Sequence, residues 1–285
     1  MYTTLITAEQ LKHLVHDHKP LMVFDCSFEL MQPREGDQQF ERVRIAGAVR
    51  ADLDRHLSAK DKSQAVNGGR HPLPTREAFA AWLASLGFQN DMQAVVYDRQ
   101  GANYCGRLWW MLKWIGHEAV AVLDGGLQAW EAVNGMVATG PDVARVPSRF
   151  TATEPRARLA TTEDVLKHLE LPDQTLIDAR APARFRGEVE PLDPVAGHIP
   201  GALNRPFNLN LGPDGKFKSP EQLKTEFLEL LGDQPPGSVV HHCGSGVSAV
   251  PNLLAMEIAG LGRGALYAGS WSEWCSDPAR PVAQG

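Results

Sequence analysis

Residues 238–256 read SVVHHCGSGVSAVPNLLAM. The first three residues are small or β-branched and predict the start of a buried strand, and the run from Cys243 to Gly246 predicts a tight, glycine-rich loop. From Val247 onward, apolar residues recur at helical spacing and predict a helix. A single cysteine therefore lies where a strand ends and a helix begins.

That position suits a reactive thiol. N–H groups of the first helical turn, with those of Gly244 and Gly246, can converge on Cys243, favour its thiolate form and bind small anions. A free cysteine is more often a small buried apolar residue, but glycines and serine pack poorly, which favours a functional loop. A cysteine phosphatase would need an arginine to close the loop, and Ala249 and Val250 stand there instead, which argues against phosphate chemistry.

The composition limits the possible functions. A chain of 285 residues with 43% hydrophobic residues can form one large domain or two of ordinary size, and its net charge of -6 gives no reason to expect nucleic acid or an anionic membrane as partner. The first ten residues lack a targeting pattern, and no apolar run could span a bilayer, so we expect a cytoplasmic protein. The cysteines form no CxxC pair, so we expect neither a disulfide framework nor a structural zinc site. They are Cys26, Cys105, Cys243 and Cys275.

The second half of the sequence repeats the first. Residues 7–10 and 161–164 have the pattern of a capping box and predict helix starts at corresponding places. Further matches share one constant offset: Val95 with Val239, Gly116 with Gly260, Gly125 with Gly269 and Trp130 with Trp274. A repeat of this length indicates duplication of a whole domain.

Strands alternate with helices in both halves. This predicts an α/β fold of two tandem domains, each a parallel sheet flanked by helices. We place the domains at residues 1–140 and 155–285, joined by a linker at 141–154. Cys243 would lie at the carboxyl ends of the strands, where such sheets bind ligands. Its counterpart in the first domain is Arg99, so only the second domain carries the nucleophile.

The loop CGSGVSA at Cys243 resembles the active-site loop of the two-domain rhodanese-type sulfurtransferases, in the branch that uses mercaptopyruvate. The resemblance covers nearly the whole chain and implies two rhodanese-like domains, the first without a catalytic cysteine. It implies that sulfane sulfur moves from 3-mercaptopyruvate through a Cys243 persulfide to a thiol such as thioredoxin or glutathione, or to cyanide. It implies no metal and no organic cofactor, and it is compatible with a monomer.

The resemblance also gives roles to single residues. Arg184 matches the arginine that binds the substrate carboxylate, a task that suits the planar guanidinium. Ser245, His71 and Asp54 match a proton relay, and Asp52 is a close rival of Asp54. The remaining loop residues would bind the donor through their N–H groups: Gly244, Gly246, Val247 and Ser248.

Two other functions stay open. The mercaptopyruvate branch usually carries a second substrate arginine after a Glu-Pro step, but Leu192 follows Glu190 and Pro191 here, so thiosulfate is an alternative donor. A sulfur-carrying or regulatory module with negligible turnover is the other alternative.

Two histidines and one further arginine in the second half are expected to be structural. His241 and His242 are neighbours on a strand and should point to opposite faces, which excludes joint metal binding. Arg180, two residues after Asp178, should form an ion pair beside the sheet.

Overall fold

The chain divides into two compact units. The computed structural model describes residues 1–59 and 61–285. Unit 1 consists of Met1–Gln64, Pro74–Ala157 and Pro213–Lys216, and unit 2 of Ala65–Leu73, Arg158–Gly212 and Phe217–Gly285. Ala65–Leu73 thus belongs to the first half of the sequence but packs within unit 2. None of the helices in the described residues is both long and apolar enough to cross a membrane.

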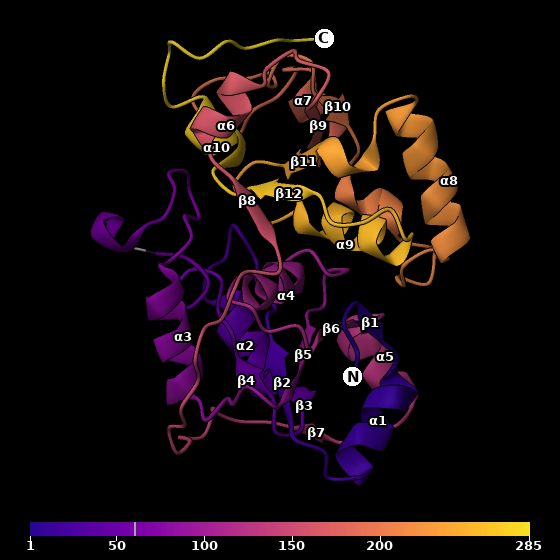
Figure 1. The fold of residues 1–285 in the computed structure, drawn as a ribbon. Coiled ribbons are helices and arrows are strands. Elements are labelled where there is room, and N and C mark those ends of the chain that lie inside the picture. Colours follow the sequence, from indigo (N-terminus) through magenta and orange to yellow (C-terminus); the bar gives the residue numbers. More distant parts are fainter. Residues whose placement is uncertain (60) are drawn as a thin grey trace. The chain divides into compact units, whose positions relative to one another are not determined.

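Unit 1 is built on a five-stranded parallel sheet with the strand order β1-β6-β5-β2-β4 (Figure 1). These strands are β1 (Leu5–Ile6), β2 (Leu21–Asp25), β4 (Val49–Arg50), β5 (Gln93–Tyr97) and β6 (Val120–Leu123). The helices are α1 (Ala8–His16), α2 (Glu35–Arg42), α3 (Arg76–Ser85), α4 (Cys105–Trp114), α5 (Gly126–Ala132) and the short 3-10 turn η1 (Lys62–Gln64). A small antiparallel pair joins β3 (Arg44–Ile45) to β7 (Val137–Ala138).

Unit 2 has a second five-stranded parallel sheet, ordered β10-β9-β11-β12-β8. Its strands are β8 (Arg158–Ala160), β9 (Thr175–Asp178), β10 (Leu203–Asn204), β11 (Val239–His242) and β12 (Ala265–Tyr267). Its helices are α6 (Thr162–Lys167), α7 (Pro182–Phe185), α8 (Pro220–Leu231), α9 (Val250–Ile258) and α10 (Ser270–Trp274), with 3-10 turns η2 (Phe207–Asn210) and η3 (Pro236–Ser238).

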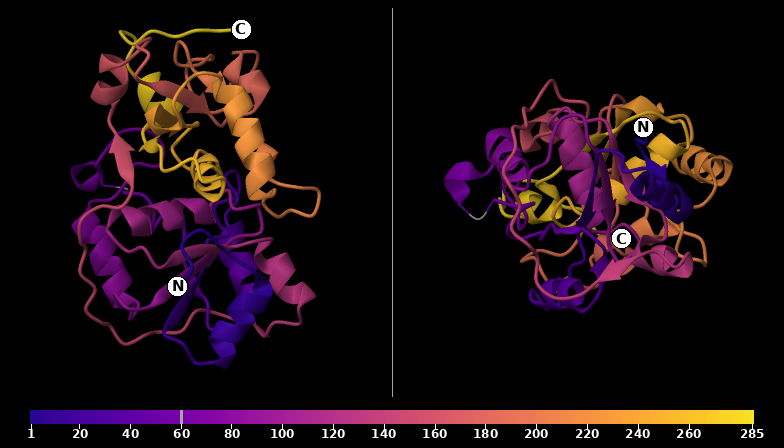
Figure 2. Two further views of the ribbon diagram at one scale, coloured as in Figure 1. Left: turned by 45° about the vertical axis from the view of Figure 1, so that its right-hand side comes forward. Right: turned by 90° about the horizontal axis from the view of Figure 1, so that it is seen from below.

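Side chains that alternate along the strands of unit 2 cover both faces of its sheet. Val240 packs in the apolar cluster that includes Trp271 and Trp274 of α10. Its neighbour Val239 packs on the opposite face, in the cluster formed by α8 and α9. The paired helices α8 and α9 can be followed in Figure 2, in orange and yellow. Both faces are therefore covered, as parallel sheets require.

The two sheets repeat each other strand for strand. Each unit begins with a strand followed by a helix with a complete capping box, formed by Thr7 in unit 1 and by Thr161 in unit 2. The strands then occupy the same order in both sheets. The predicted α/β fold with two tandem parallel sheets is confirmed. The helix after Cys243 begins at Val250, later than the sequence pattern suggested, because residues 247–249 form a turn.

Candidate functional site

Cys243 follows β11 directly and begins the loop of residues 243–249. Its N–H donates to Oγ of Ser270 (3.1 Å), and its carbonyl accepts the N–H of Trp271 (3.0 Å). The carbonyl of Gly244 accepts the N–H of Ser272 (2.9 Å). The start of α10 therefore fixes the loop at three points. Cys243 is buried, with an exposed fraction of 2%.

The loop after Cys243 presents a set of backbone N–H groups. Among residues 1–59 and 61–285, no acceptor pairs with the N–H of Gly244, Ser245, Val247 or Ser248. All of these residues except Ser248 are buried, and Ser248 is half-buried. Because buried N–H groups are almost always paired, such a set indicates a place for an anion.

The corresponding loop of unit 1 is filled by its own carboxylate. Asp98 follows β5, and its oxygens accept four backbone hydrogen bonds of 2.8 to 3.0 Å. The donors are the N–H groups of Gln100, Ala102, Tyr104 and Cys105. His242 stands at the place of Asp98 in the repeat and brings no carboxylate. Arg99, the counterpart of Cys243, is paired with Asp25 at 3.0 Å.

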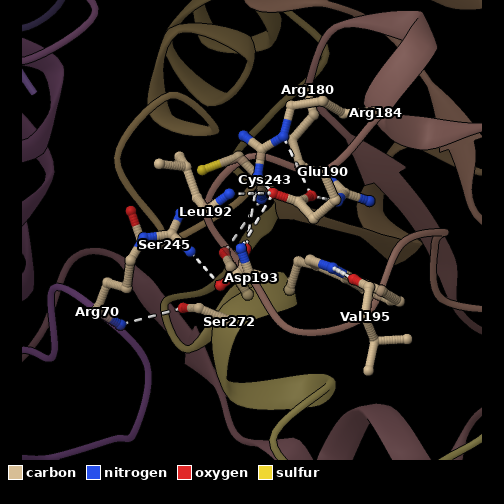
Figure 3. A network of polar contacts seen from close by, with 12 residues as sticks. Arg70, Arg180, Arg184, Glu190, Leu192, Asp193, Val195, Cys243, Ser245 and Ser272 are labelled. Atoms are coloured by element: carbon tan, nitrogen blue, oxygen red, sulfur yellow. Dashed lines mark hydrogen bonds and ion pairs between the residues drawn. The ribbon is translucent and has the colours of Figure 1, made fainter. Parts of the chain in front are cut away.

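Two guanidinium groups reach the loop beside Cys243. A β-carbon added at Gly244 would lie 2.8 Å from Nη2 of Arg70 and 3.4 Å from Nη1 of Arg184. Figure 3 shows both arginines with Cys243 and Ser245. Positive charges beside Gly244 favour the binding of an anion next to the cysteine.

Arg184 is held by two nearly buried carboxylates. It donates to both oxygens of Glu190, at 3.2 and 2.7 Å, and lies 3.4 Å from Asp193. Burial acts to raise the pKa of Glu190, but the hydrogen bonds from Arg184 and from the N–H groups of Leu192 and Asp193 lower it below its usual value. Glu190 therefore stays ionised and orients Arg184.

Arg180 forms the expected structural ion pair. Its Nη2 lies 2.7 Å from Oδ2 of Asp178, and the two side chains are 2% and 0% exposed. Burial acts to raise the pKa of Asp178, but His242 and Arg180 lower it overall. Arg180 also reaches Glu190 at 3.4 Å and so links the sheet to the carboxylate that holds Arg184.

The two histidines of β11, His241 and His242, are fully buried. Nε2 of His241 lies 3.2 Å from the sulfur of Met256 in α9, and burial lowers the pKa of His241 to about 3. Nδ1 of His242 lies 3.9 Å from Asp178, and burial lowers the pKa of His242 as well. In the part of the chain that the structure describes, no three His, Cys, Asp or Glu side chains are placed to hold a metal ion.

Ser245 and His71 meet, although they are 174 positions apart. Nδ1 of His71 lies 2.8 Å from Oγ of Ser245, and each residue is 7% exposed. His71 reaches Ser245 because Ala65–Leu73 packs within unit 2. Asp54 belongs to unit 1, so its pairing with His71 stays a prediction. Its rival Asp52 forms an ion pair with Arg50 at 3.0 Å.

The other three cysteines are poor nucleophiles. Burial, together with nearby carboxylates, raises the pKa of Cys26 and of Cys105 well above the usual value for a thiol. Burial also raises the pKa of Cys275. These thiols stay protonated near neutral pH, so Cys243 is the candidate nucleophile.

The model of the rhodanese-like domain matches residues 7–133 and again residues 161–277. The chain belongs to the rhodanese family. It is 44% identical over 282 residues to a probable 3-mercaptopyruvate sulfurtransferase from Pseudomonas aeruginosa, covering 99% of this chain and 98% of that protein. It is 38% identical over 285 residues to a putative thiosulfate sulfurtransferase from Mycobacterium tuberculosis, covering 99% and 97%. The solved structure of SseA from Escherichia coli, a 3-mercaptopyruvate sulfotransferase, matches with a TM-score of 0.80 and 31% identity over 95% of this chain and 100% of that one.

The resemblance to two-domain sulfurtransferases is thus confirmed, and the chain is a rhodanese-like sulfurtransferase. Several residues around the loop of this rhodanese-family protein were not predicted to be part of the site: Arg70, Asp193, Ser270 and Ser272. Arg70 stands beside the predicted His71, and that position was the only available signal. Ser270 and Ser272 follow Gly269, the repeat counterpart of Gly125. Nothing in the sequence around them indicates a contact with the Cys243 loop, which lies 27 positions before Ser270.

Proposed function

We propose that the chain transfers a sulfane sulfur from 3-mercaptopyruvate through a persulfide on Cys243. The observation that carries the proposal is the set of loop N–H groups next to this cysteine for which the described residues supply no acceptor. Such groups stabilise a negative charge that forms on sulfur during the reaction. The full-length similarity to a probable 3-mercaptopyruvate sulfurtransferase supports this choice of donor.

The reaction has two displacement steps at sulfur. The Cys243 thiolate attacks the sulfur of the donor, so an S–S bond forms while the C–S bond breaks. The electron pair of the C–S bond stays on carbon and gives the enolate of pyruvate, while the proton of the donor thiol passes to solvent. An acceptor thiolate or cyanide then takes the outer sulfur and restores the Cys243 thiolate. Thioredoxin and glutathione are the thiols we propose as acceptors.

The enolate needs a proton at its methylene carbon to become pyruvate. We assign this delivery to Ser245 and His71, whose Oγ and Nδ1 are 2.8 Å apart. A hydroxyl that exchanges protons with an imidazole can pass one to a nearby carbanion. Asp54 completes the proposed relay by orienting His71.

The charges around the loop favour a donor with one negative charge. A network of ion pairs beside the loop contains three positive and three negative side chains. They are Arg70, Arg180 and Arg184, against Asp178, Glu190 and Asp193. Because the charges of this network already balance, a bound donor adds its own net negative charge to the half-buried site. That charge is smaller for the monoanion mercaptopyruvate than for the dianion thiosulfate, so desolvation opposes mercaptopyruvate less. Arg184 would bind the donor carboxylate through its planar fork.

The intact mass of the protein tests the proposal. After incubation with 3-mercaptopyruvate, we expect a gain of one sulfur that dithiothreitol removes. The Cys243→Ser variant should gain none, whereas Cys275→Ser, a matched change at another buried cysteine, should gain it as the wild type does. No added sulfur on the wild-type protein would contradict the proposal.

Turnover separates the two donors. With cyanide as acceptor, thiocyanate formation should have a higher kcat/KM with 3-mercaptopyruvate than with thiosulfate. The reverse order would assign the chain to thiosulfate, as the name of the Mycobacterium tuberculosis relative suggests for that protein. Sulfur loading without turnover would indicate a sulfur-carrying module.

A further inference from the structure

We infer that Arg70 is a second binding residue for the carboxylate of the sulfur donor, acting together with Arg184. The inference rests on the proposed function and adds a residue to its site. Arg70 comes from Ala65–Leu73, the segment of the first half of the sequence that packs within unit 2. The uncharged Leu192 leaves the loop after Glu190 without a cation of its own.

The guanidinium groups of Arg70 and Arg184 face the same point. Both come within 3.4 Å of a β-carbon added at Gly244, the residue that follows the cysteine. Their side chains are 26% and 18% exposed, so both groups are accessible to a small solute. Two guanidinium groups that converge from different segments form a site for one carboxylate.

Asp193 shows that this pair of arginines accepts a carboxylate. One of its oxygens is paired with Nη1 of Arg70, and the other lies 3.4 Å from Nη2 of Arg184 (Figure 3). The Asp193 side chain is only 4% exposed, and its N–H donates to Glu190 at 3.2 Å. The buried Asp193 carboxylate therefore bridges Arg70 and Arg184 and keeps their guanidinium groups close together.

Arg70 has donors left for a ligand. Its Nε is buried and, within the described residues, has no hydrogen-bond partner. Its Nη2, the atom nearest to Gly244, also has no acceptor in that part of the chain. Since buried polar atoms are normally paired, the buried Nε points to a missing acceptor, and Nη2 adds a second donor beside Gly244.

The backbone fixes Arg70 relative to the reactive loop. The N–H of Arg70 donates to Oγ of Ser272 (3.1 Å), and the N–H of Ser272 donates to the carbonyl of Gly244 (2.9 Å). One serine thus connects the segment of Arg70 to the residue after Cys243. The N–H of Gly68 adds a bond to Glu273 at 3.0 Å. Arg70 is therefore placed by the same contacts that place the cysteine loop.

The test compares two donors that load the cysteine, one with and one without a carboxylate. They are 3-mercaptopyruvate and the persulfide of 2-mercaptoethanol, and loading is followed by intact mass over a range of donor concentrations. For Arg70→Gln we expect the half-saturating concentration of mercaptopyruvate to rise at least tenfold, while that of the carboxylate-free persulfide stays unchanged. Arg70→Lys should recover part of the loss. Arg186→Gln, in an exposed pair with Glu188, serves as the matched control and should behave as wild type.

Each result bears on the inference. Unchanged mercaptopyruvate loading in Arg70→Gln would overturn it and leave the proposed function standing. An equal loss with both donors would also overturn it, because it would show that Arg70 only supports the fold of the loop. No loading of the wild-type protein by mercaptopyruvate would refute the proposed function itself, and the inference with it.

Discussion

The stability of unit 2 should respond very differently to one added methyl group at two glycines of the Cys243 loop, Gly246 and Gly244. Gly246 has a φ of +72°, a left-handed conformation that L side chains adopt at a cost of about 1–2 kcal/mol. A β-carbon there would also strike the backbone of Ala268, and its distance to the Cα of Ala268 would be 2.8 Å. Overpacking of this kind costs about 1–3 kcal/mol. For Gly246→Ala we therefore expect a loss of about 2–5 kcal/mol in the free energy of unfolding of unit 2.

Gly244 differs because its φ is not left-handed and the nearest atom is the end of a flexible side chain. The added methyl group would lie 2.8 Å from Nη2 of Arg70, which can move away. Replacing glycine by alanine in a compatible conformation stabilises a protein by about 0.4–1 kcal/mol through the unfolded chain. Gly244→Ala should therefore change the free energy of unfolding by less than about 1 kcal/mol. It should nevertheless weaken mercaptopyruvate loading, because it displaces Arg70.

Urea titration measures both variants. Because a chain with two compact units need not unfold in a single step, hydrogen exchange of peptides from unit 2 should accompany the titration and assign the loss to the correct unit. Equal unfolding midpoints for Gly246→Ala and the wild type would refute the steric reasoning. An equally large loss in Gly244→Ala would refute it as well, because the contacts at the two positions would then not decide the outcome.

The remaining predictions concern buried charge. Asp178→Asn should lower the free energy of unfolding by about 3–5 kcal/mol, because it leaves Arg180 buried without its main partner. Urea titration measures this loss. The control Glu188→Gln changes an exposed ion pair and should keep the wild-type unfolding midpoint. Stability should fall as the pH drops below about 6.5, because His241 takes up a proton near there in the unfolded chain but only near pH 3 in the folded one. Between about pH 7 and pH 5, His241→Gln should lose about 2 kcal/mol less of its free energy of unfolding than the wild type does. The exposed control His16→Gln should keep the wild-type dependence of the free energy of unfolding on pH, and the same dependence in His241→Gln would contradict the assignment.

The sequence by itself determined the features that depend on short-range patterns. Hydrophobic periodicity and glycine placement gave the strand, loop and helix around Cys243, since these follow from local backbone preferences. Strands alternating with helices in both halves of the repeat predicted the pair of parallel sheets, and the two capping boxes predicted the starts of α1 and α6. The ion pair of Asp178 with Arg180 followed from their spacing of two residues at the end of a strand.

Only the tertiary structure decided which side chains surround the cysteine. Arg70 meets Asp193 across 123 positions, and His71 meets Ser245 across 174. These contacts exist because Ala65–Leu73 packs within unit 2, and packing between distant segments leaves no periodic trace in either of them. The structure also decided whether each loop is filled. In unit 1 the Asp98 side chain turns back and accepts N–H groups two to seven positions later, whereas His242 at the matching position in unit 2 brings no carboxylate. Hydrophobic periodicity does not indicate such a turn of a single polar side chain.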